Sequence, residues 1–116
     1  MTEITRAMPR PTAQVEPYVQ VLGAELAAKF ILAFGGSEIH LAADPKGRSA
    51  VEGLIGQEKT KALAAHPAIQ MKQRVPLARK WLVLMLAWQG WSHAQIARTV
   101  RTSDTTVRRY VKESAK

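Results

Sequence analysis

Apolar residues recur at helical spacing early in the chain. They occupy one side of a helix that the pattern predicts from about Val15 to Phe34. The stripe consists of Tyr18, Leu22, Leu26, Phe30 and Phe34. Gly35 and Gly36 come next, and glycine readily takes the left-handed conformation that closes a helix. We therefore expect this helix to end at the double glycine.

The pattern changes after the double glycine. Residues 37–41 (SEIHL) alternate polar and apolar side chains, as a half-buried strand does, and Pro45 and Gly47 are expected to end that strand. A second helix is predicted from about Ser49 to Ala65, with Pro67 just beyond its end. Its candidate buried residues are Val51, Leu54, Ile55, Ala62 and Leu63. A second short strand is predicted within residues 68–76, through Ile69, Met71 and Val75.

Two stretches of the N-terminal half resemble each other. Leu22-Gly23 precedes Glu25, and Ile55-Gly56 precedes Glu58 at the same spacing. Each stretch leads through a predicted helix to a predicted strand and then to a proline. The sequence thus contains a weak internal repeat.

The C-terminal part begins with another predicted helix, from about Leu77 to Gln89. Its apolar face consists of Trp81, Leu82, Leu84, Met85 and Trp88. Gly90 suits the left-handed end of this helix. The face is wide enough to pack against two small helices, so a trihelical module is predicted.

The local chemistry around Ser92 indicates the start of the next helix. Ser92 can serve as N-cap, and Gln95 completes a capping box with it. Trp91 and Ile96 occupy the positions of a hydrophobic staple. We predict a helix from about His93 to Val100.

Ser103 can cap a further helix after a turn through Arg101 and Thr102. Many comparable motifs have glycine at the position of Arg101, so either that residue accepts a strained turn or the turn differs. Ala97 would let the two helices cross closely. The shared buried face would consist of Ile96, Val100, Val107 and Tyr110. Two short helices joined by a tight turn predict a helix-turn-helix DNA-binding unit, the alternative being an ordinary helical hairpin with a solvated basic face.

The distribution of charge agrees with a polyanionic partner. The chain of 116 residues has 17 Lys and Arg against 9 Asp and Glu, a net charge of +8. Residues 1–66 are neutral in sum, so the excess lies in residues 67–116, where only Asp104 and Glu113 are acidic. Double-stranded DNA is therefore the expected partner.

The second helix of the motif would place its outward residues in the major groove. Arginine can donate two hydrogen bonds to guanine, a threonine methyl can touch thymine, and an aspartate can accept a hydrogen bond from cytosine. The predicted base-contacting residues are Asp104, Thr105, Arg108 and Arg109. The predicted contacts to the DNA backbone are Ser92, Arg98, Arg101, Ser103, Thr106 and Lys112.

Several functional classes find no support in the sequence. His40, His66 and His93 lack ligand-like spacing and cysteine is absent, so no metal and no cofactor is expected. No glycine-rich phosphate loop or matched nucleophile and base is present, so an enzyme is not expected. The apolar run from Trp81 to Trp88 is too short to cross a bilayer, which argues against a membrane role. We expect a cytoplasmic protein.

The predicted fold is mainly α-helical and has three parts. Residues 1–14 are expected to be a flexible arm, residues 15–76 a helical dimerisation region with a short two-stranded β element, and residues 77–116 the helix-turn-helix domain. A neutral, apolar region gains most by burying its stripe against a second copy, so a homodimer is expected. The predicted dimerisation residues are Tyr18, Leu22, Leu26, Phe30, Phe34, Ile39 and Leu41.

Two motifs add a resemblance to a known family. Residues 34–40 (FGGSEIH) and residues 88–97 (WQGWSHAQIA) resemble the Mor transcription activator family of Mu-like phages. The resemblance covers roughly residues 20–112. The chain departs from the family pattern at His40, where tyrosine is usual, at Pro45, which comes late, and in a longer stretch from Asp44 to Pro76. The resemblance implies a homodimer that activates phage middle or late promoters by contacting RNA polymerase, in a bacterium or a phage-infected host.

The combined prediction is a sequence-specific, dimeric DNA-binding transcription regulator. Two alternatives stay open at this point. The same module could select the site for a recombinase or a phage packaging machine. The tryptophans and the stripe from Tyr18 to Phe34 could instead bind a protein partner.

Overall fold

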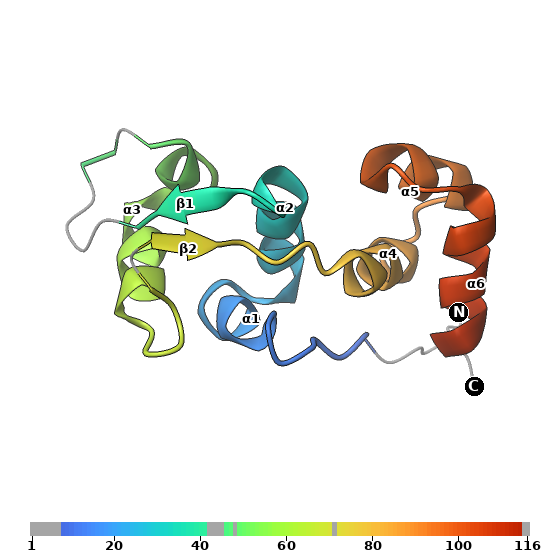
Figure 1. The fold of residues 1–116 in the computed structure, drawn as a ribbon, viewed down its shortest axis with the longest axis horizontal. Coiled ribbons are helices and arrows are strands. Elements are labelled where there is room, and N and C mark those ends of the chain that lie inside the picture. The colour runs from blue at the N-terminus through green and yellow to red at the C-terminus, as the bar shows by residue number, and fades with distance from the viewer. Residues whose placement is uncertain (1–7, 42–45, 48, 71, 115–116) are drawn as a thin grey trace. The chain divides into compact units, whose positions relative to one another are not determined.

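The computed structural model describes residues 8–41, 46–47, 49–70 and 72–114, and these residues form six helices and two short strands (Figure 1). The mainly helical fold with a small two-stranded sheet agrees with the sequence prediction. The chain divides into two compact units. The N-terminal unit contains residues 11–78, and the C-terminal unit contains the described residues 8–10 and 79–114.

The predicted helix from Val15 to Phe34 is in fact two helices. Helix α1 (Glu16–Leu22) and helix α2 (Ala24–Phe34) are separated at Gly23, whose backbone has φ 83° and ψ 157°. This conformation lies far from helical values and is accessible almost only to glycine. The prediction of a single helix is therefore wrong at Gly23.

The apolar stripe forms much of the core of the N-terminal unit. Tyr18 and Phe30 are fully buried, and their ring centroids lie 5.5 Å apart. The ring of Phe30 also lies 5.2 Å from that of Phe34. Ala27, Ala28 and Ile31 are buried as well, outside the predicted stripe. The buried face is therefore wider than a single stripe.

The sheet joins strand β1 (Glu38–His40) to strand β2 (Lys72–Arg74). The strands are antiparallel (Figure 1). Ile39 lies opposite Gln73. Both strands are shorter than predicted. Ile39, Leu41, Ile69 and Val75 are buried at or beside the strands, whereas Met71 and Pro45 lie outside the described residues.

Helix α3 (Ala50–Ala65) begins after Ser49 and is kinked at Gly56, where φ is 87° and ψ is 162°. Val51, Ile55 and Leu63 are buried as predicted. Leu54 and Ala62 are exposed, so the prediction is wrong for them. Val51 and Ile55 are the buried residues before the kink, and Thr60 and Leu63 are buried after it. The Thr60 hydroxyl donates a 2.8 Å hydrogen bond to the Gly56 carbonyl, which lets this polar side chain be buried.

The weak sequence repeat has a structural counterpart. Gly23 and Gly56 have nearly the same backbone angles, and each separates two helical segments that lead to a strand. The strand register is symmetric about the pair of Ile39 and Gln73, so a two-fold rotation through this pair would interchange β1 and β2. The N-terminal unit therefore contains two similar helix–glycine–helix segments, each of which leads to one strand of the sheet.

The two glycine kinks lead to a matched prediction. Gly23→Ala and Gly56→Ala should each lower the free energy of unfolding by about 1–3 kcal/mol, because an added Cβ strains this backbone conformation. Neither Cβ would meet a neighbouring atom within 4 Å, so the expected cost is conformational and not steric. Urea denaturation followed by circular dichroism measures it.

Gly53 provides the control for this prediction. It lies within helix α3, without a positive φ and with open space around its Cβ position. Gly53→Ala should therefore stabilise the unit by about 0.5–1 kcal/mol. Equal effects of all three alanine substitutions would contradict the assignment of strain to the kinks.

Glu52 holds the start of helix α3 and is 9% exposed. Its Oε2 accepts hydrogen bonds from the Ser49 hydroxyl at 2.8 Å and from the Ser49 backbone N–H at 3.3 Å, and its Oε1 accepts one from the Gly47 N–H. The Glu52 N–H in turn donates to Ser49 Oγ at 3.1 Å. The Ser49 hydroxyl, followed by these backbone donors, lowers the pKa of the Glu52 carboxyl below its ordinary value of 4.5, against the opposing effect of burial.

A pH dependence of stability follows from the lowered pKa of Glu52. The ionised carboxylate contributes its full stabilisation of the folded state above about pH 4.5. This contribution is lost as the pH falls through the folded-state pKa. The wild type should therefore be more stable than Glu52→Gln at pH 7, and the difference should shrink below pH 4.5. Thermal unfolding of both proteins across this range measures it. A difference that stays constant with pH would contradict the expected linkage.

Two further features concern the described residues as a whole. None of their helices combines the length and apolar character needed to cross a membrane. No cluster of three or more potential metal-ligating side chains occurs among them.

Candidate nucleic-acid interface

Helix α4 (Arg79–Trp88) is the first helix of the C-terminal unit. It begins later than the predicted Leu77 because Ala78 has a φ of 44°, which a right-handed helix excludes. Gly90 closes it with a φ of 97°, and the Trp91 N–H donates to the Leu86 carbonyl at 3.0 Å. The buried residues are Trp81, Leu82, Val83, Met85 and Leu86. Leu84 and Trp88 are half-buried, so the buried face includes Val83 and Leu86 beyond the prediction.

Helix α5 (His93–Val100) has the predicted bounds. Ser92 Oγ accepts a hydrogen bond from the Gln95 N–H at 3.1 Å, and Gln95 Oε1 accepts one from the Ser92 N–H at 3.1 Å. This is the predicted capping box. Ile96 and Ala97 are buried, and Trp91 is 37% exposed. The start of α5 is thus determined by its own residues.

Arg101 forms the turn after α5 in a left-handed conformation, with φ 61° and ψ 56°. Its backbone N–H and that of Thr102 both donate to the Ala97 carbonyl, the latter at 2.9 Å. This hydrogen-bonding pattern is typical of helix ends at which glycine is preferred. Of the two possibilities that the sequence left open, the structure contains the strained turn.

Replacing Arg101 with glycine should raise the stability of the domain and lower its affinity for DNA. Relief of the left-handed strain, offset by the greater chain entropy of glycine, should raise stability by about 0.5–1 kcal/mol. The same change removes a cation that we expect to contact phosphate, so DNA affinity should fall at all sequences. Thermal unfolding and DNA titration measure the two effects. A less stable glycine variant would show that the Arg101 side chain stabilises the turn.

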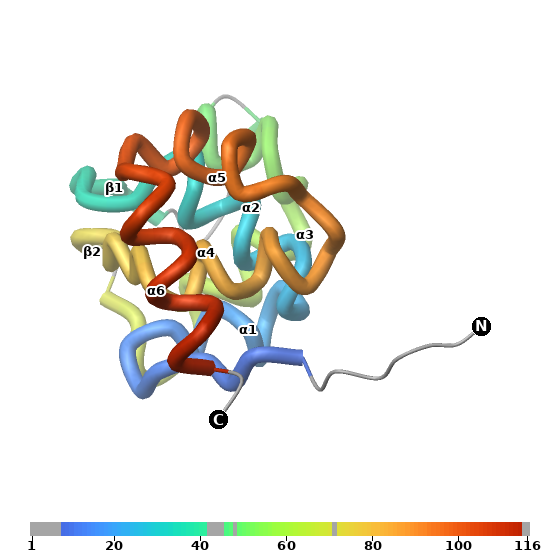
Figure 2. The backbone as a smooth tube through the Cα atoms, turned by 90° about the vertical axis from the view of Figure 1, so that its right-hand side faces the viewer, coloured from blue at the N-terminus to red at the C-terminus, as the bar shows by residue number. Residues whose placement is uncertain are grey.

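Helix α6 (Asp104–Ser114) follows Ser103, whose Oγ accepts a hydrogen bond from the Thr106 N–H at 3.0 Å. The predicted cap is therefore present. Val107 is fully buried, Ile96 and Val100 of α5 are also buried, and Tyr110 is half-buried. Helices α4, α5 and α6 all contact one another, and Figure 2 looks onto α6 and its turn from α5.

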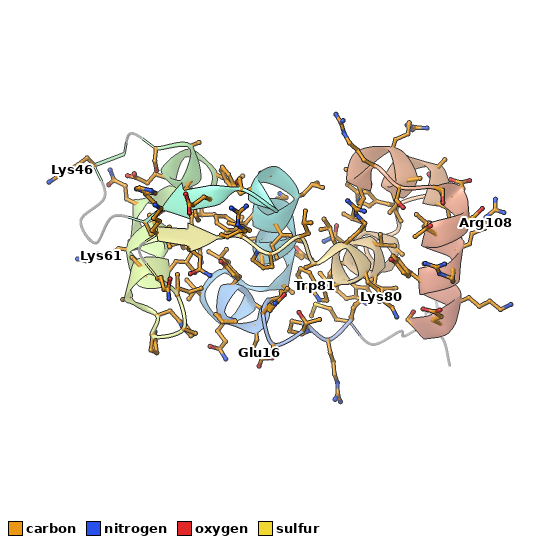
Figure 3. All side chains as sticks on the ribbon, viewed as in Figure 1. Glu16, Lys46, Lys61, Lys80, Trp81 and Arg108 are labelled. Atoms are coloured by element: carbon orange, nitrogen blue, oxygen red, sulfur yellow. The ribbon has the colours of Figure 1, made fainter. Side chains whose placement is uncertain are left out.

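The opposite face of α6 is open to solvent. Its exposed residues are Asp104, Thr105, Arg108, Arg109 and Lys112, and these residues form what we call the reading face. Arg108 Nη2 lies 3.6 Å from Asp104 Oδ2, one helical turn away. The Arg108 side chain extends outward from α6 (Figure 3). The reading face thus presents cations and one hydroxyl around a single anion.

Most of the residues predicted to contact the DNA backbone are exposed. Ser92, Arg98, Arg101 and Ser103 are exposed, and Thr106 is half-buried. The Ser103 hydroxyl donates to Thr106 Oγ1 at 3.0 Å. The three serine and threonine hydroxyls are therefore already engaged in hydrogen bonds near the helix starts, whereas the two arginines are exposed.

One cluster behind the reading face was missed by sequence reasoning. Lys80 Nζ donates to Glu113 Oε1 at 3.1 Å and lies 5.6 Å from the centre of the Tyr110 ring. The Arg109 guanidinium lies 5.4 Å from the same ring. Both distances fall within the range of cation–π attraction. Lys80 and Glu113 are 33 residues apart, so no local pattern could reveal the pair.

The start of the chain contributes one contact to this unit. Trp81 Nε1 donates a 3.4 Å hydrogen bond to the Pro9 carbonyl. Residues 1–7 of the predicted arm lie outside the described residues.

The residues predicted for dimerisation lie in the N-terminal unit. Five of the seven are buried within the single chain: Tyr18, Leu22, Phe30, Ile39 and Leu41. Leu26 and Phe34 are half-buried. Most of the stripe is therefore covered by the chain's own residues.

Comparison with known proteins finds a match for the C-terminal part. Residues 74–116 match the family model of the homeodomain-like domain. Neither the curated proteins nor the solved structures provide a match. The matched segment includes α4, α5, α6 and the capped turns described above. The chain therefore carries a C-terminal helix-turn-helix of the homeodomain-like type, a domain that suggests DNA binding.

Proposed function

We propose that the protein is a sequence-specific DNA-binding transcription regulator that inserts helix α6 into the major groove. The observation that carries this proposal is the reading face: Thr105, Arg108 and Arg109 are exposed together on the second helix of a homeodomain-like helix-turn-helix. Because Val107 on the opposite side of α6 is buried, the reading face points to solvent. The proposed role is one of binding and not of catalysis.

The chemistry of the reading face suits base recognition. Each arginine can donate two hydrogen bonds to O6 and N7 of a guanine, and the Thr105 methyl can contact a thymine methyl. We propose that Arg98, Arg101 and Lys112 neutralise phosphates and that the hydroxyls of Ser92, Ser103 and Thr106 contact the DNA backbone. Binding should weaken steeply with salt, because each neutralised phosphate releases counterions.

The proposal includes a homodimer. One helix-turn-helix contacts too few base pairs for high specificity, and two copies related by a dyad double the contacts. Because most of the apolar stripe is buried within the chain, we assign the contact to the outer surface of the N-terminal unit, where Leu26 and Phe34 are half-buried and Leu54 is 37% exposed.

The finer role rests on the resemblance to Mor activators. Residues 34–40 form a helix-to-strand step and residues 88–97 form the capped entry to α5. On this basis we propose an activator of phage promoters that contacts RNA polymerase in the cytoplasm of the host. A transcription assay on the selected site, with and without the protein, distinguishes activation from repression.

Selection of bound duplexes from a random DNA pool tests the function. We expect a two-fold symmetric consensus from the wild type, with enrichment that falls as salt rises. A consensus without symmetry would contradict the dimer. Enrichment of no sequence at any salt concentration would overturn the DNA-binding role and favour a protein-interaction module. Assembly into a ring, or with a catalytic partner, would favour a recombinase or packaging subunit over a regulator.

A further inference from the structure

Asp104 is an unusual residue on a surface proposed to meet DNA. It is the first residue of α6, and its side chain is 47% exposed. Carboxylate repels the phosphate backbone, so its presence on the reading face lowers affinity for every DNA sequence. A negative charge in the first turn stabilises α6 through the helix dipole. That stabilisation does not explain why the charge lies on the face proposed to meet DNA.

The neighbour of Asp104 gives the carboxylate a more specific role. Arg108 Nη2 lies 3.6 Å from Asp104 Oδ2, at a separation of four residues, where side chains on a helix meet. The Arg108 side chain is 68% exposed, and no packing holds a long side chain at such exposure. The carboxylate therefore limits the directions that the guanidinium takes before DNA binds.

We propose that Asp104 is a positioning residue that sets sequence discrimination through Arg108. The ion pair keeps the Arg108 guanidinium over the middle of the reading face, where it can donate hydrogen bonds to the edge of a base. It also keeps the guanidinium away from the neighbouring phosphates. The anion also weakens binding to DNA that lacks the matching base. This inference rests on the proposed function and replaces the idea that Asp104 itself contacts cytosine.

The second acidic residue of α6 provides a matched control. Glu113 carries the same charge on the same helix, but it pairs with Lys80 at 3.1 Å and not with an arginine of the reading face. Glu113→Ala therefore removes one negative charge from the domain without releasing Arg108. Any effect of overall charge appears in both variants, whereas an effect through Arg108 appears only at Asp104.

The experiment measures dissociation constants for the duplex selected by the wild type, for single-base-pair variants of it and for an unrelated duplex. It compares the wild type, Asp104→Ala, Arg108→Ala, their double variant and Glu113→Ala over a salt series. Circular dichroism of each variant confirms that α6 is folded.

Asp104→Ala is expected to bind the unrelated duplex at least about 3-fold more tightly, because an anion has been removed from a surface facing phosphates. Its salt dependence should steepen by about 0.9 in log–log slope, as Arg108 moves to a phosphate. Discrimination should fall by about 2-fold, as expected for the loss of an exposed ion pair between residues four apart on a helix, and at the same base pair as in Arg108→Ala. The double variant should discriminate no worse than Arg108→Ala alone, and Glu113→Ala should keep the wild-type discrimination.

Two results would overturn the inference while leaving the proposed function intact. One is that Asp104→Ala discriminates between the selected duplex and its single-base-pair variants as well as the wild type does. The other is a loss at a different base pair that adds to the loss in Arg108→Ala, which would make Asp104 a direct reader of a base. A wild-type chain that selects no duplex would overturn both the proposed function and this inference.

Discussion

Replacing Arg108 and Arg109 together with alanine is expected to abolish discrimination between the selected site and unrelated DNA. A well-placed arginine–guanine contact contributes about 1–3 kcal/mol of discrimination, so the pair accounts for most of what one helix can supply. Both residues are exposed, and Val107 continues to anchor α6, so the fold should persist. Titration of both duplexes with wild type and variant measures the loss.

A second substitution separates base recognition from phosphate contact. Lys112→Ala should weaken binding to all sequences about equally and should reduce the log–log salt slope by about 0.9. Discrimination should stay at the wild-type level. If the double arginine variant also lowered affinity uniformly, without loss of discrimination, Arg108 and Arg109 would be phosphate contacts and the bases would be read elsewhere.

Phe30→Ala is expected to cause the largest loss of stability in the N-terminal unit. The side chain is 0% exposed; its ring stacks on that of Tyr18 and lies tilted against that of Phe34. Its removal loses buried apolar area and leaves a cavity, at a cost of about 3–5 kcal/mol. Small domains are stable by only about 5–15 kcal/mol, so this change removes a large part of the total. Urea denaturation followed at 222 nm measures it.

The chain offers two comparisons for this experiment. Phe34→Ala removes the same ring from a half-buried position and should cost less than Phe30→Ala. The three tryptophans, Trp81, Trp88 and Trp91, all lie in the C-terminal unit, so their emission follows that unit separately. A loss below about 1 kcal/mol for Phe30→Ala would contradict its place at the centre of the core.

The helices of the C-terminal unit were the most predictable part of the chain. The capping box of α5, the Ser103 cap of α6 and the buried Ala97 involve residues within one or two turns of each other, so their chemistry is complete in a short segment. Exposure of the reading face followed from the same period that buries Val107. The start of α4 differed, because nothing in the sequence signals the positive φ of Ala78, and its buried face also included Val83 and Leu86.

The N-terminal half was harder to predict because its glycines lie in patterns that otherwise continue a helix. The stripe from Tyr18 to Phe34 keeps its period across Gly23, so periodicity alone indicated one helix. Leu54 is exposed because Val51 and Ile55 form the buried face of this part of α3. The weak repeat around Gly23 and Gly56 carried the missing information, but its meaning required the backbone angles.

Local sequence was sufficient for the helix-turn-helix, for its capped ends and for the basic charge beside it, since these depend on residues close along the chain. Tertiary structure decided which elements meet. It paired Ile39 with Gln73 and Lys80 with Glu113, and it covered most of the apolar stripe with residues of the same chain. Such contacts join distant residues, and each depends on how the whole unit packs, so no short pattern in the sequence specifies them.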